Sequence, residues 1–185
     1  MKRNSERIYD EFLVAAAITG DRPAQARLVA RWQPRLWRYA RRILGDVDRA
    51  NDIAQEAWME ILKGLARLDD VAAFPAWAYR IVTRRCQRTF AATDRAWTSP
   101  DIDDAYYEVD APEHASTEFV AEVSIVLDVV RQLPAAQRAV MALFYIEDLS
   151  VAEIAVATDV PPGTVKTRLM RARRKVRALL EGEHS

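Results

Sequence analysis

The sequence predicts an all-α protein made of two small helical domains joined by an acidic linker. Half of the 185 residues are hydrophobic and only five are glycine. Apolar side chains recur every three or four positions over most of the chain, which is the spacing of amphipathic helices. No apolar run approaches the eighteen or so residues that a membrane-spanning helix needs. We therefore expect a folded, cytoplasmic protein without membrane insertion.

The charges are unevenly distributed although they sum to zero. Residues 1–90 carry 17 basic and 11 acidic side chains, residues 91–122 carry one and nine, and residues 123–185 carry nine and seven. The acidic segment also contains Pro100 and Pro112. These features predict domains at 1–90 and 123–185 with a linker at 91–122.

The sequence has no residue pattern for a metal site or an internal disulfide. Cys86 is the only cysteine, and the only histidines are His114 and His184. These three residues have no zinc-ligand spacing, and one cysteine forms no internal disulfide. We therefore expect no metal, no cofactor and no catalytic residue.

Four helices are expected in the first domain, at about residues 8–18, 21–44, 48–62 and 74–90. The second ends at Gly45 and has Pro34 as a possible kink. The fourth has Pro75 in its first turn, where proline is tolerated. Helical spacing in the third predicts four inward side chains: Ile53, Ala57, Ile61 and Leu62.

The second domain is expected to contain a helix-turn-helix. A helix over 123–133 is closed by Pro134, and Ala139, Val140, Leu143 and Phe144 form the apolar side of the next. Ser150 and Glu153 form a capping-box pattern at the start of a short third helix, whose core-facing residues are Ile154 and Ala155. That helix stops near Thr158, and the last helix begins at or just before Thr164.

The last helix has one apolar stripe and one basic face. The stripe consists of Val165, Leu169, Ala172, Val176 and Leu179. The opposite face offers hydroxyls, guanidinium groups and an amine that fit the major groove of duplex DNA. Its candidate DNA-binding residues are Thr164, Lys166, Thr167, Arg168, Arg171 and Arg174. A charge run alone would favour a solvated surface, but the preceding short helix and turn favour DNA reading.

Three segments, which follow one another in the same order as in a known family, resemble that family. Residues 133–138 (LPAAQR), 149–155 (LSVAEIA) and 160–173 (VPPGTVKTRLMRAR) resemble region four of the sigma-70 family. The closest group is the small, two-domain extracytoplasmic-function (ECF) group. The resemblance implies that this domain binds the minus-thirty-five promoter element and the flap of the RNA polymerase β subunit. Asp159 stands where the family often has glycine, and aspartate tolerates that backbone shape.

Two segments of the first domain resemble region two of the same family. Residues 52–58 (DIAQEAW) resemble its core-binding helix, which implies that Asp52, Gln55 and Glu56 bind the β′ clamp helices of core RNA polymerase. Residues 74–81 (FPAWAYRI) resemble the start of its promoter-opening helix. Without the resemblance, the carboxylate and amide face would be an ordinary solvated surface.

The fourth helix interleaves aromatic and basic residues, as binding of a separated DNA strand requires. Its candidate minus-ten DNA-binding residues are Trp77, Tyr79, Arg80, Arg84, Arg85 and Arg88. Trp77 is as consistent with the core as with DNA. The loop 63–73 corresponds to the family's base-capturing loop. Arg84 and Arg88 replace residues that are commonly Asn and Asp, so the minus-ten specificity stays open.

The sequence as a whole is interpreted as a dissociable initiation factor, an alternative sigma factor that directs promoter-specific transcription and is not an enzyme. The family implies promoter DNA, core polymerase and an anti-sigma factor as partners. The resemblance implies that the acidic linker threads toward the polymerase active centre, and its composition fits an extended tether equally well. The alternatives are a helix-turn-helix regulator that does not recruit polymerase, and a helical adaptor or sequestering protein.

Overall fold

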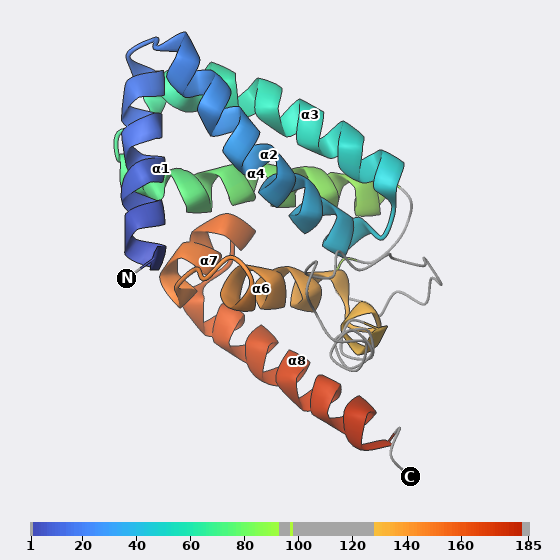
Figure 1. Ribbon diagram of the computed structural model, residues 1–185. Helices are drawn as coiled ribbons and strands as arrows, with labels where there is room; N and C mark the ends of the chain where they lie inside the picture. Colours follow the sequence, from blue (N-terminus) through green and yellow to red (C-terminus); the bar gives the residue numbers. More distant parts are fainter. Residues whose placement is uncertain (1, 93–96, 98–127, 183–185) are drawn as a thin grey trace, which may run out of the picture.

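The computed structural model describes residues 2–92, 97 and 128–182, and every regular element in these ranges is helical (Figure 1). The first domain contains α1 (Lys2–Ile18), α2 (Arg22–Leu44), α3 (Val47–Gly64), the 3₁₀ turns η1 (Leu65–Arg67) and η2 (Val71–Ala73), and α4 (Phe74–Ala92). The second contains α6 (Ala135–Tyr145), α7 (Val151–Thr158) and α8 (Pro162–Gly182). The predicted all-α fold is confirmed. The proposed linker falls almost entirely outside the described residues, and the expected helix over 123–133 is described only from residue 128, with 128–131 helical.

Local signals account for several helix ends. The Asp21 side chain accepts a hydrogen bond from the Ala24 amide at 3.0 Å, and Gly45 ends α2 in the left-handed conformation with φ of 77°. Pro34 lies inside α2 without ending it. The capping box at Ser150 and Glu153 is confirmed, and Asp159 closes α7 with φ of 54°.

An aromatic cluster between α2 and α4 forms the centre of the first domain. Trp32 and Phe74 lie edge to face with ring centroids 5.0 Å apart, and so do Tyr39 and Tyr79 at 5.0 Å. All four side chains are fully buried. Large rigid rings of this kind fix the distance and rotation of α4 relative to α2.

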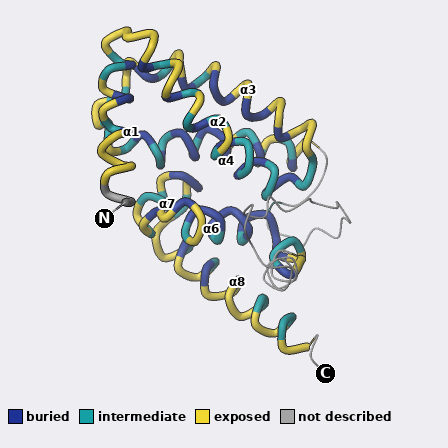
Figure 2. Tube along the Cα trace, viewed as in Figure 1, coloured by how far each residue is buried: buried dark blue, intermediate teal, exposed yellow. Residues whose placement is uncertain are grey.

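The predicted inward face of α3 needs one correction. Ile53, Ala57 and Ile61 are buried as expected, but Leu62 is 44% exposed. Successive helical residues are separated by about 100° around the axis, so Leu62 leaves the stripe that Ile61 continues. In α8 the expected stripe is buried at Val165, Leu169 and Ala172 but only half-buried at Val176 and Leu179, where the helix extends past its neighbours (Figure 2).

The two domains pack against each other through α4 with α7 and α2 with α6. Their buried residues form one contiguous hydrophobic cluster. Arg138, only 7% exposed, donates to the Ile43 carbonyl at 2.7 Å and the Leu133 carbonyl at 2.8 Å. The first carbonyl lies in the last turn of α2, where the helix dipole favours a cation. The domains therefore share a core in this structure, an arrangement that the sequence pattern did not reveal.

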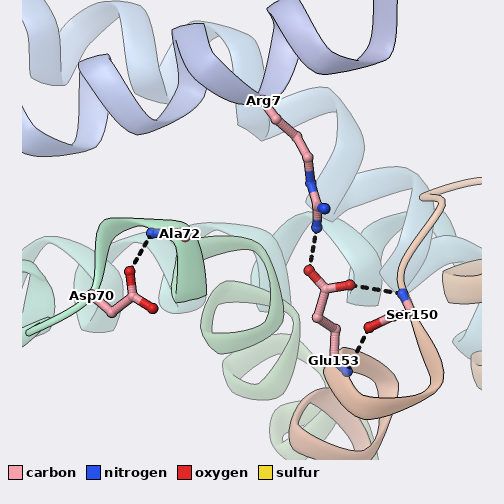
Figure 3. A network of polar contacts seen from close by, with 5 residues as sticks. All are labelled: Arg7, Asp70, Ala72, Ser150 and Glu153. Atoms are coloured by element: carbon pink, nitrogen blue, oxygen red, sulfur yellow. Dashed lines mark hydrogen bonds and ion pairs between the residues drawn. The ribbon is translucent and has the colours of Figure 1, made fainter.

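The N-terminal helix adds a polar contact to this packing. Figure 3 shows Arg7 of α1 reaching the Glu153 carboxylate, which also accepts from the Ser150 amide at 2.7 Å. Burial opposes ionisation of Glu153, but the contacts with Ser150 and Arg7 outweigh it and hold the pKa of Glu153 below its ordinary value. A depressed folded-state pKa stabilises the fold above the unfolded-state pKa and ceases to do so as the pH falls through the folded-state pKa.

We therefore expect Glu153→Gln to lower the melting temperature at pH 7, and we expect this effect to shrink as the pH falls below the ordinary glutamate pKa of 4.5. Thermal denaturation followed by circular dichroism at several pH values would measure the difference. Glu6→Gln, at an exposed position of α1, is the charge-matched control. A difference between wild type and Glu153→Gln that grows on acidification would contradict this reading of Glu153.

The contact between Gly64 and Trp77 gives a second expectation. A Cβ on Gly64 would lie 2.9 Å from Cζ2 of Trp77. Gly64→Ala should therefore displace the indole ring, change its fluorescence and lower stability by about 1 kcal/mol. In a Trp77→Ala background the same change should become stabilising, because alanine favours helix over glycine. Gly182→Ala, where nothing lies within 4 Å, is the control; equal effects at both glycines would exclude the steric explanation.

Candidate nucleic-acid interface

The candidate duplex-reading residues lie together on α8. Lys166, Thr167, Arg171 and Arg174 are exposed, whereas Thr164 and Arg168 are half-buried. The Thr167 hydroxyl donates its proton to the Gly163 carbonyl within the same helix, at 3.0 Å, so this proton is already used in a hydrogen bond. The left-handed residue Asp159 turns the chain between α7 and α8, and this turn leaves the basic face of α8 outward.

Arg168 differs from the other cations of this face. Partial burial lowers its pKa, and its Nη1 is buried without a hydrogen-bond partner among the described residues. An arginine remains protonated at neutral pH even with such a shift. The Arg168 side chain therefore packs partly against the protein, whereas the side chains of Lys166 and Arg171 extend into solvent.

The candidate strand-binding residues divide between two sides of α4. Arg84 and Arg88 are exposed, and Arg80 is 42% exposed while its Nη2 pairs with the Asp159 carboxylate at 2.9 Å. Tyr79 faces the opposite way, fully buried beside Trp32 and Tyr39, and burial raises the pKa of its hydroxyl well above the ordinary value. In this structure Tyr79 therefore presents no ring face to a DNA strand.

Trp77 lies at the border between the core and the surface. It is half-buried, its ring centroid lies 6.2 Å from that of Phe74, and its Cζ2–Cη2 edge lies beside Gly64. The residue belongs partly to each of the two environments that the sequence left open. Its exposed part lies on the same side of α4 as Arg80 and Arg84, three and seven positions later.

The candidate polymerase-binding residues Asp52, Gln55 and Glu56 are all exposed on α3. Two apolar side chains that we did not assign to this surface, Met59 and Leu62, are 57% and 44% exposed beside them. Met59 follows Gln55 by one helical turn, and Leu62 follows Met59 by almost one. The signal in the sequence was an apolar residue outside the buried stripe of the helix.

Arg85 lies between α4 and α3. Its guanidinium pairs with Glu56 and, at 2.8 Å, with Glu60, and its side chain is 19% exposed. The structure thus places a candidate DNA-binding cation in contact with a candidate polymerase-binding carboxylate. Neither pairing follows from spacing along one helix, because the partners belong to different helices.

No group of three or more His, Cys, Asp and Glu side chains suited to a metal ion occurs in the described ranges. None of the described helices is long and apolar enough to cross a membrane. Cys86 is fully buried, and burial raises its pKa, so its thiol is not activated.

Comparison with known proteins finds a family match in each of the two helical domains. The family model for Sigma-70 region 2 matches residues 28–96, and the model for Sigma-70, region 4 matches residues 124–176. The ECF RNA polymerase sigma-E factor of Escherichia coli is 30% identical over 187 aligned residues, which cover 93% of this chain and 94% of that protein.

Solved structures share the fold. CnrH, in complex with the cytosolic domain of CnrY, has a TM-score of 0.68 at 24% identity and covers 94% of this chain and 98% of its own. The sigma factor RpoE of Bartonella quintana, in complex with the anti-sigma factor NepR, has a TM-score of 0.63 at 19% identity and covers 84% and 96%.

The match to two separate sigma regions excludes both alternatives: a regulator that has only a helix-turn-helix, and a helical adaptor or sequestering protein. Factors of this family confer promoter specificity and leave catalysis to the polymerase. The chain therefore belongs to the sigma-70 family as an ECF-group alternative sigma factor, which binds core RNA polymerase and directs promoter-specific initiation of transcription without being an enzyme.

Proposed function

We propose a division of labour among three helices of this sigma factor. The exposed face of α3 binds the β′ clamp helices, the basic face of α8 reads the minus-thirty-five element, and α4 holds the opened minus-ten strand. The observation that carries this proposal is the segregation of charge. The α3 face offers Asp52, Gln55 and Glu56, whereas the exposed faces of α4 and α8 offer mainly cations. Acidic and basic surfaces of this kind select protein and DNA partners respectively.

At the minus-thirty-five element, α8 enters the major groove with its first turns foremost. Lys166 and Arg171 are exposed and long enough to reach base edges or phosphates. Thr167 can still accept a hydrogen bond, since its proton is already donated to Gly163. Thr164, Arg168 and Arg174 flank these residues and contact the backbone in this proposal.

At the minus-ten element, the separated strand follows the exposed side of α4. Arg84 and Arg88 neutralise phosphates there, and the exposed edge of Trp77 supports a base. Tyr79 contributes indirectly, because its buried ring packs α4 against Tyr39 of α2. The loop 63–73 would capture a flipped base, and its η2 turn is held by the Asp70 carboxylate, which accepts from the Ala72 amide at 2.9 Å (Figure 3).

Binding both elements requires the two domains to separate. Elements centred about 25 base pairs apart lie on the order of 85 Å from each other along the duplex. A folded chain of this length has a radius of gyration of about 16 Å. We infer that polymerase binding draws α7 away from α4 and α6 away from α2, which also frees Arg80 from Asp159. Domain boundaries at 1–90, 91–122 and 123–185 suit this motion.

Two further partners are proposed, each from a separate observation. The groove between α6 and α8, lined by residues that include Met141, Tyr145, Val176 and Leu180, is the apolar surface we assign to the β flap. An inhibitory anti-sigma factor is proposed because the related RpoE structure contains one. The protein acts in the cytoplasm, where the polymerase is.

Run-off transcription with purified core polymerase and a promoter library tests the proposal as a whole. Promoter-specific transcripts that depend on the added chain are expected. Binding to DNA without any effect on transcript choice would instead support a regulator that does not recruit polymerase.

Arg171→Ala should weaken binding of the holoenzyme to a selected promoter about 5- to 100-fold, because one base or phosphate contact by arginine is lost. Affinity for core polymerase should not change. Electrophoretic mobility shift and core-binding titrations would measure the two quantities, with Arg27→Ala on exposed α2 surface as the control. A parallel loss of core affinity would argue against a DNA-reading role for Arg171.

A further inference from the structure

Arg85 links the two surfaces that the proposed function assigns to different partners. Its guanidinium lies between two carboxylates of α3, pairing with Glu56 and with Glu60 at 2.8 Å. The Arg85 side chain is 19% exposed, whereas those of Glu56 and Glu60 are 54% and 41% exposed. The cation is therefore covered by the pair, while the carboxylates remain accessible from outside.

The two carboxylates belong to one acidic ridge. Asp52, Glu56 and Glu60 follow one another at four-residue intervals, so they lie along the same side of α3. Like charges at this spacing repel each other, and Arg85 offsets part of that repulsion from the neighbouring helix. Of the ridge, Asp52 and Glu56 also belong to the face that we assign to polymerase.

Arg85 and a basic residue of the polymerase would therefore compete for the same Glu56 carboxylate. An exposed carboxylate exchanges readily between such partners, because surface ion pairs are individually weak. Arg88 lies three residues after Arg85 on α4, close to one helical turn away. A guanidinium released from Glu56 thus has a phosphate-binding neighbour within the reach of its own flexible side chain.

We propose that Arg85 couples polymerase binding to strand capture: polymerase takes Glu56, and the displaced guanidinium turns to a phosphate of the opened strand beside Arg88. In the free protein the same arginine offsets part of the negative charge of the polymerase-binding ridge. This inference rests on the proposed roles of α3 and α4. It makes Arg85 a positioning residue before assembly and a DNA contact after it.

Coupling of this kind predicts that removal of Arg85 strengthens core binding and weakens strand binding. Thermodynamic linkage requires that a group which competes with polymerase for Glu56 weakens polymerase binding. Removing that group strengthens core binding and at the same time removes one phosphate contact. A purely structural strut would weaken both interactions when removed, and a pure DNA contact would leave core binding unchanged.

The test uses the full chain with Arg85→Gln, core polymerase, and a promoter from the run-off selection that carries a pre-opened minus-ten region. Core affinity, measured by fluorescence anisotropy, should rise about two- to five-fold. The slope of log promoter affinity against log salt concentration should fall in magnitude by about 0.7, as expected for one lost single-strand phosphate contact. Arg27→Gln should change neither quantity.

Glu60→Gln keeps the test decisive if Arg85→Gln folds poorly. Without the Glu60 carboxylate, Arg85 pairs only with Glu56 of these two and competes more strongly with polymerase for it, so core affinity should fall. This fall should disappear in the Arg85→Gln/Glu60→Gln double variant. Unchanged or reduced core affinity in a folded Arg85→Gln variant, or additive effects of the two changes, would overturn the coupling. Failure of the wild-type chain to bind core polymerase would instead overturn the proposed function.

Discussion

The packing of α2 against its neighbours is the constraint on which the rest of the structure depends. This helix contacts α1, α3 and α4 on the side of the first domain and α6 on the side of the second. Its buried Trp32 and Tyr39 hold α4 in one rotation, with Phe74 and Tyr79 inward. Arg84 and Arg88 are outward as a direct consequence, because an α-helix with one face committed to a core presents the opposite face to solvent.

Arginine has two distinct uses in this protein. Arg138 donates to backbone carbonyls in the interior, and Arg35 bridges the buried carboxylates of Asp10 and Glu147. Arg84, Arg88 and Arg171 remain at the surface. The first kind holds helices together, and the second kind is available for phosphates and bases. A guanidinium suits both uses because its donors are planar, permanently charged and directional.

If the two domains bind two promoter elements, as we propose, they must do so in a state different from this closed packing. Among the ion pairs between the domains in the described ranges, Arg7 with Glu153 and Arg80 with Asp159 are partly exposed and contribute little stability individually, whereas the Glu147 carboxylate that pairs with Arg35 is buried. The hydrogen bonds of Arg138 and the packing of α4 against α7 contribute more, and in the proposed function polymerase binding offsets them. An interface built in this way can hold a compact free protein and still open when a large partner binds both halves.

The sequence by itself determined the helices, their caps at Asp21, Gly45 and Ser150, and the exposed faces of α3 and α8, because these depend on residues within one or two turns. Tyr79 and Arg85 show where that reasoning ends: composition suggested DNA contacts, whereas neighbours on other helices bury the first and pair the second. Only the tertiary structure decided the contacts between domains. Arg138 meets Ile43 across 95 residues and Arg35 meets Glu147 across 112. No periodic pattern records such pairings, because they arise from how completed helices pack and not from the order of residues within them.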